Sequence, residues 1–198
     1  IPAVIGVGDS FLSEINEGDT AIVDGFTGEI IVSPDEQTLK AYTEKQKRDE
    51  EQKKLLQELK GKENITLDGT KINVFANISG IDNIGAVLLN DAGGIGLFRS
   101  EFLYLENSDF PTEEQQFHAY KRVLESMAGK KVIIRTLDIG ADKQVDYFGL
   151  KKEENPALGL RAIRICLTRP EIFRTQLRAL FRASVYGNLG IMFPCLLY

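Results

Sequence analysis

The stretch that decides the fold is residues 94–104, Gly-Ile-Gly-Leu-Phe-Arg-Ser-Glu-Phe-Leu-Tyr, an apolar run that becomes polar at an arginine. Residues 132–140, Val-Ile-Ile-Arg-Thr-Leu-Asp-Ile-Gly, repeat this pattern. Short, continuous apolar runs are typical of buried parallel strands. Each predicted strand therefore places an arginine, Arg99 or Arg135, at its carboxyl end.

These two arginines predict a bound anion. In parallel α/β folds, ligands are held at the carboxyl ends of the strands, and a guanidinium suits phosphate or carboxylate. The alternative is that each arginine caps a helix or pairs with an acid such as Glu101 or Asp138. Arg161, which follows the loop 155–160, either joins the same site or belongs to the solvated face of an amphipathic helix.

The loop after the second arginine strand contains Asp138, Asp142 and Lys143. Carboxylates at this place either orient the arginines or hold a metal. We favour orientation, because a magnesium site needs carboxylates that converge from several segments, so we predict no metal ligand in this chain. His118 is the only histidine and lies in a predicted helix, which is more typical of a surface residue than of a catalytic one.

The composition of the chain argues against several classes of function. The chain has 198 residues, 43% of them hydrophobic, and a formal net charge of -5, which argues against a nucleic-acid partner. No apolar run is long enough to cross a bilayer, so membrane insertion is not expected. Cys166 and Cys195 lie far apart in the sequence, as expected of reduced thiols in a cytoplasmic protein.

Three regions differ in pattern. Residues 1–33 contain short apolar runs, including 3–5, 20–23 and 29–32, separated by turn residues, which predicts small strands and a hairpin. Residues 34–64 are predicted to form a polar linker helix, which starts with Ser33 as the cap and ends near Gly61.

Residues 65–198 alternate between strand-like and helix-like stretches. The predicted strands are 71–77, 94–99, 131–138 and 189–194; the predicted helices are 81–90, 112–128 with a cap at Thr112-Glu113-Glu114-Gln115, and 156–187 with a break near Pro170. This order predicts an α/β fold with a right-handed parallel sheet. Four such units make either a small open sheet or half of a closed barrel.

Four motifs carry a family resemblance. Residues 94–104, 111–117 (Pro-Thr-Glu-Glu-Gln-Gln-Phe), 132–143 and 155–164 closely resemble enzyme I of the bacterial phosphoenolpyruvate:sugar phosphotransferase system. The likeness runs through nearly the whole chain. The sequence of residues 1–6 is similar to the segment that follows the phosphorylated histidine of that family.

The resemblance implies a partial (β/α)8 TIM-type barrel of about four strands. The barrel is preceded by a linker helix and by the last hairpins of a swivelling phosphohistidine domain. It implies that Arg99, Arg135 and Arg161 bind phosphoenolpyruvate. It also implies Mg²⁺, a histidine-containing phosphocarrier protein as partner, and a homodimer of the intact enzyme.

The resemblance also implies that the phosphorylated histidine, the proton donor and the metal ligands lie outside this chain. We therefore expect an internal fragment that is inactive alone. Two alternatives remain at this point. One is a fragment of a pyruvate phosphate dikinase or phosphoenolpyruvate synthase relative; the other is a truncated, non-catalytic binding or assembly module.

Overall fold

The computed structural model describes residues 2–8, 11–13, 15–140 and 145–195. The chain divides into two compact units, Ile1–Lys60 and Gly61–Tyr198. Within the described residues, no helix has both the length and the hydropathy that a membrane span requires.

The first unit contains the predicted hairpin. Strands β1 (Ala21–Asp24) and β2 (Glu29–Val32) pair antiparallel, with Ala21 opposite Val32. The Asp24 carboxylate accepts the backbone N–H of Phe26 at 2.9 Å and holds the turn. Residues 3–5 form no strand, contrary to the prediction, because their backbone joins no ladder.

Helix α1 (Glu36–Gln57) follows the hairpin and, as its polar sequence predicts, has no buried residue. Its cap is Asp35, which accepts the N–H of Thr38 at 2.7 Å. The predicted cap, Ser33, is wrong; it lies before the helix with a φ of 48°. Tyr42 of this helix donates a hydrogen bond to Glu29 at 2.9 Å, which attaches α1 to the hairpin.

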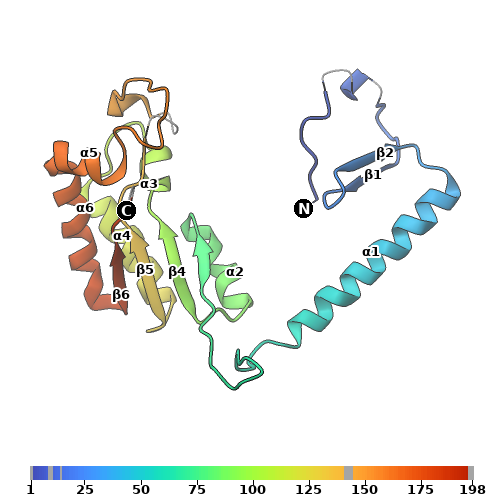
Figure 1. Ribbon diagram of the computed structural model, residues 1–198, viewed down its shortest axis with the longest axis horizontal. Coiled ribbons are helices and arrows are strands. Elements are labelled where there is room, and N and C mark those ends of the chain that lie inside the picture. Colours follow the sequence, from blue (N-terminus) through green and yellow to red (C-terminus); the bar gives the residue numbers. More distant parts are fainter. Residues whose placement is uncertain (1, 9–10, 14, 141–144, 196–198) are drawn as a thin grey trace. The chain divides into compact units, whose positions relative to one another are not determined.

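The second unit contains a parallel four-stranded sheet, as predicted, and its strand order is β3-β4-β5-β6 (Figure 1). The strands are β3 (Ala76–Ile78), β4 (Gly94–Arg99), β5 (Lys131–Arg135) and β6 (Leu189–Met192). The connecting helices are α2 (Ile84–Leu89), α3 (Phe102–Leu105), α4 (Glu113–Ser126), α5 (Ala162–Thr168) and α6 (Pro170–Ala183). Short 3-10 turns occupy 11–13, 81–83, 146–148 and 184–186.

Several predicted boundaries differ from the structure. The first strand of the sheet is β3 rather than 71–77, since Val74 accepts a hydrogen bond from Gly93 in a loop before the ladder begins. Strand β5 ends at Arg135 rather than at Asp138. The helical region begins at Ala162 rather than at 156, because residues 155–159 form turns. The predicted break at Pro170 is confirmed.

Helices α2, α4 and α6 pack against one face of the sheet. Val132 and Ile134 of β5 are fully buried in this core, together with Tyr120 and Val123 of α4 and Leu180 of α6. Successive strand residues point to opposite faces, and the intervening Ile133 belongs to neither buried cluster of the described residues. Arg135 has the same parity as Ile133, so its side chain leaves the strand on the face away from this core.

A second apolar cluster lies beyond the carboxyl ends of the strands. It brings together Tyr104 of α3, Leu137 and Ile139 after β5, Phe148, and residues of α5 and α6. The Tyr147 hydroxyl donates a hydrogen bond to the Tyr104 carbonyl at 2.6 Å. This cluster anchors the loops that leave β4 and β5.

Candidate anion-binding site

The two strand-end arginines lie side by side. In the ladder between β4 and β5, Arg99 pairs in register with Arg135, and each is the last residue of its strand. The spacing of the sequence motifs therefore places both arginines at one edge of the sheet.

Arg135 is the centre of an ion-pair cluster. Its Nη2 lies 2.6 Å from Glu101 Oε1, and its Nη1 lies 3.0 Å from Asp138 Oδ2. Arg161 Nη2 lies 3.0 Å from Asp138 Oδ1, so one carboxylate bridges two guanidinium groups. Arg135 therefore pairs with both acids, which is one of the alternatives that the sequence allows. Arg135 and Arg161 nevertheless lie close together, because both contact Asp138.

The cluster is mostly buried. The side chains of Arg135, Asp138 and Arg161 are 13 to 17% exposed, and that of Glu101 is 5% exposed. Glu101 Oε2 and Arg135 Nε are buried and have no hydrogen-bond partner among the described residues. Ionic interactions are strengthened where water is excluded, so the guanidinium groups here interact strongly with negatively charged groups.

Arg99 differs from the other two arginines. It is exposed, and no hydrogen bond or ion pair involves its side chain among the residues that the structure describes. Among the described residues, Arg99 and the cluster together carry three guanidinium groups and two carboxylates, a formal surplus of one positive charge. Arg99 can therefore bind an anion without displacing an acid.

The backbone around Arg161 is constrained. Arg161 is the N-cap residue of α5 and has an extended backbone. The next residue, Ala162, is fully buried, has a φ of 47°, and donates its N–H to the Ile139 carbonyl at 2.9 Å. A left-handed conformation costs a residue with a side chain about 1 to 2 kcal/mol, and here the surrounding packing holds Arg161 beside Asp138 at that cost.

A buried polar network lies behind the cluster. Gln176 of α6 is fully buried; its Oε1 accepts the Leu137 N–H at 2.9 Å, and its Nε2 donates to Ser100 Oγ and to the Tyr120 hydroxyl, both at 3.1 Å. The Ser100 hydroxyl donates to the Arg135 carbonyl at 2.8 Å. Sequence reasoning missed Gln176; the available signal was one polar residue on the apolar face of a helix, four residues after Ile172.

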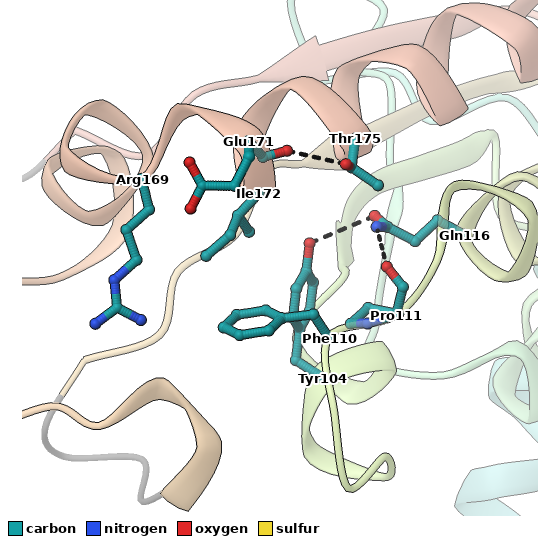
Figure 2. Close-up of a pocket in the computed structure, with 8 residues that line it drawn as sticks. All are labelled: Tyr104, Phe110, Pro111, Gln116, Arg169, Glu171, Ile172 and Thr175. Carbon is teal, nitrogen blue, oxygen red and sulfur yellow. Dashed lines mark hydrogen bonds between the residues drawn. The ribbon is translucent and has the colours of Figure 1, made fainter.

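A cavity of about 410 Å³ lies next to this network, between the start of α6 and the loop after α3 (Figure 2). Figure 2 shows the Tyr104 hydroxyl and the Pro111 carbonyl both reaching the Gln116 amide. Arg169 and Glu171 are its charged lining residues. None of the three site arginines lines it, so the cavity and the arginine cluster are separate features.

Other sequence-based candidates take no part in the described cluster. Asp142 and Lys143 lie outside the residues that the structure describes. His118 is exposed on α4, 3.2 Å from Glu114, as expected of a surface residue. Within the described ranges, no three His, Cys, Asp or Glu side chains are grouped as metal ligands. The carboxylates of the arginine cluster, Glu101 and Asp138, form ion pairs with arginines. Because a cation would have to compete with these guanidinium groups, the two carboxylates do not fit a Mg²⁺ site.

A parallel α/β sheet with arginines at the carboxyl ends of its strands is typical of proteins that bind anionic ligands. Residues 53–197 match the family described as PEP-utilising enzyme, PEP-binding domain, where PEP is phosphoenolpyruvate. The chain therefore belongs to the PEP-utilising enzymes.

Similar proteins share one name. The chain is 54% identical to the phosphoenolpyruvate-protein phosphotransferase of Staphylococcus epidermidis, 51% to that of Staphylococcus carnosus and 52% to that of Staphylococcus aureus, each over 194 residues. Each comparison covers 98% of this chain and 34% of the relative, so the chain spans about a third of the length of these curated relatives. The resemblance predicted from the four motifs is confirmed.

Proposed function

We propose that this chain contributes part of the phosphoenolpyruvate site of a phosphoenolpyruvate-protein phosphotransferase. The observation that carries the proposal is the convergence of Arg99, Arg135 and Arg161 beyond the carboxyl ends of two neighbouring strands. Phosphoenolpyruvate bears a phosphate and a carboxylate, and both are anions that guanidinium groups bind well. The names of the relatives favour this enzyme over a dikinase or a synthase.

The arginines have different roles in this proposal. Arg99 is exposed and makes the first contact with the incoming anion. Arg135 and Arg161 are oriented by Glu101 and Asp138, and Arg135 keeps further donors for substrate because a guanidinium has five N–H groups. Transfer of a phosphoryl group is catalysed mainly by positioning and charge stabilisation, which is what pre-oriented arginines supply.

The sheet is proposed to be half of a (β/α)8 barrel. Support comes from its parallel order and from the packing of α2, α4 and α6 against one face. Arg135 leaves its strand on the other face, which becomes the interior when such a sheet closes. In this arrangement, residues 65–198 are the first half of the barrel, 34–64 are the linker, and 1–33 belong to a swivelling phosphohistidine domain.

The remaining chemistry is assigned to parts of the enzyme other than the described residues. The described residues include no fitting Mg²⁺ site. In an enzyme of the relatives' length, the phosphorylated histidine and the metal ligands come from segments beyond this chain. A histidine-containing phosphocarrier protein as partner, a homodimer and a cytoplasmic location are parts of the same proposal, as is the inactivity of this chain alone.

Calorimetric titration with phosphoenolpyruvate tests the site. We expect the wild-type chain to bind, and Arg99→Gln to bind about tenfold more weakly, because a hydrogen bond to a charged group contributes about 1.5 to 3 kcal/mol. Arg122→Gln is the matched control, since Arg122 is an exposed arginine on α4. No binding by the wild-type chain, or equal affinities of wild type and Arg99→Gln, would contradict the proposal.

A further inference from the structure

We propose that Gln176 is a positioning residue that sets the separation of the two loops that follow the arginine-ended strands β4 and β5. One loop begins after Arg99 and contains Ser100 and Glu101; the other begins after Arg135 and contains Leu137 and Asp138. Gln176 lies on α6, and the hydrogen bonds of its side chain go to Leu137, Ser100 and Tyr120. Its link to phosphoenolpyruvate rests on the function proposed above, whereas its link to the Arg135 side chain does not.

The first step of the argument is that one amide holds both loops. Gln176 Oε1 accepts the Leu137 N–H at 2.9 Å, and Gln176 Nε2 donates to Ser100 Oγ at 3.1 Å. Leu137 is the residue immediately before Asp138, and Ser100 lies between Arg99 and Glu101. The two hydrogen bonds therefore act directly next to both acids that orient Arg135.

The second step is that the loops are also joined to each other. Ser100 Oγ, which receives the amide of Gln176, donates its own hydrogen to the Arg135 carbonyl at 2.8 Å. A hydroxyl that both accepts and donates fixes the distance between its two partners. The position of Gln176 is in this way transmitted to the backbone of Arg135 through a single side chain.

The third step is that the amide itself cannot turn freely. The second hydrogen of Nε2 goes to the Tyr120 hydroxyl at 3.1 Å, and that hydroxyl donates to Gln116 Oε1 at 3.1 Å. Burial raises the pKa of Tyr120, which keeps its hydroxyl protonated and able to donate. Gln116 is fixed in turn by the Pro111 carbonyl at 3.0 Å.

The fourth step concerns the position of Gln176 in its helix. Its neighbours on the buried face of α6 are Ile172, Ala179, Leu180 and Ala183. A polar side chain among these residues costs free energy unless all its hydrogen bonds are made. An apolar residue of similar size would fill the same space, so what the amide adds is a fixed geometry of the two loops.

The test compares Gln176→Met, which keeps the volume but removes the amide, with Val123→Ala, a substitution in the apolar core outside this network. The primary readout is solvent exchange of the Arg135 Nε–Hε proton by NMR, with the signal assigned by its loss in Arg135→Lys. Arg135 Nε is buried in the wild type. We expect exchange at least about tenfold faster in Gln176→Met and unchanged in Val123→Ala. Ser100→Ala, which removes one link only, replaces Gln176→Met if that variant does not fold.

The second readout is the affinity for phosphoenolpyruvate, measured well below the melting temperature of every variant. We expect Gln176→Met to bind about tenfold more weakly, and Val123→Ala to bind like the wild type. Exchange of the Arg135 proton at the wild-type rate in folded Gln176→Met would overturn the positioning role. Failure of the wild-type chain to bind phosphoenolpyruvate would instead contradict the proposed function and leave the exchange experiment decisive for Gln176.

Discussion

Arg135 and Glu101 form a short ion pair that is largely removed from solvent. Arg135 Nη2 lies 2.6 Å from Glu101 Oε1, and the two side chains are 17% and 5% exposed. Pairs of this kind contribute little net stability when formed from solvated charges, yet removal of one partner leaves an uncompensated charge in the interior. The pair therefore holds Arg135 in place, and substitution of Glu101 should lower the stability of the fold substantially.

Substitution Glu101→Gln tests this relationship. We expect the free energy of unfolding of the second unit to fall by about 3 kcal/mol, because the Arg135 charge loses a close partner in a poorly solvated place. Urea unfolding followed by circular dichroism measures the change. Glu125→Gln is the control, since Glu125 pairs with Lys121 on the surface at 3.8 Å and should cost less than about 1 kcal/mol. Equal losses in both variants would refute the prediction.

The end of α4 offers a stabilising substitution. Ala128 follows this helix with a φ of 48°, a conformation that favours glycine. We expect Ala128→Gly to raise the free energy of unfolding by about 1 kcal/mol, measured by urea denaturation. Ala119→Gly, in the interior of the same helix, should lower it by about 1 kcal/mol. A lower stability of Ala128→Gly would show that the left-handed conformation is not strained.

The hairpin of the first unit should depend on pH. The hydrogen bond from Lys45, aided by the backbone N–H of Phe26, lowers the pKa of Asp24 from 3.8 to about 2. A lowered pKa means that the carboxylate stabilises the folded unit at every pH above about 4, and that this contribution is lost as the pH falls to about 2. NMR titration of the Asp24 carboxyl carbon should give a midpoint near 2. A midpoint near 3.8 would rule out the contact with Lys45 in solution.

The two cysteines should react very differently. Burial raises the pKa of Cys166 to about 11, so little thiolate exists at neutral pH, whereas Cys195 is exposed. We expect a maleimide at pH 7 to label Cys195 within minutes and Cys166 only in denaturant, as mass spectrometry of the peptides would show. The variant Cys195→Ser is the control, and rapid labelling of this folded variant would contradict the burial of Cys166.

The sequence predicts best those elements whose signals are local. Strand β4 has the predicted bounds, and the cap of α4 forms as its motif indicates: Thr112 Oγ1 accepts the N–H of Gln115 at 3.2 Å, and Gln115 Oε1 accepts the N–H of Thr112 at 2.8 Å. The sequence does not predict the short helix α3, because four residues are too few to show a helical period. The predicted start of α5 is too early, because the N–H of Leu158 bonds the Asn155 carbonyl at 3.1 Å and that of Gly159 bonds the Pro156 carbonyl at 3.4 Å, as in turns.

In the candidate site, too, the sequence predicts the residues that have a local signal and misses those that depend on long-range contacts. Arg99 and Arg135 are recognisable because each ends an apolar run, and parallel strands bring their ends together. The sequence offers Glu101 and Asp138 as possible partners of the arginines. The bridge from Asp138 to Arg161, however, joins residues 23 positions apart, which no local pattern indicates. Gln176 is 76 positions from Ser100 and 39 from Leu137, and no local pattern reports such a contact.

The carboxylate of Asp138 contacts both Arg135 and Arg161, and this sharing makes the two arginines thermodynamically dependent on each other. When either one is substituted, the acid can reorient toward the other, so the strength of the remaining ion pair changes. The effects of single substitutions at these two positions will therefore not sum to the effect of the double substitution. An experiment that ranks the arginines one at a time would measure the redistribution of one negative charge rather than the separate contribution of each residue.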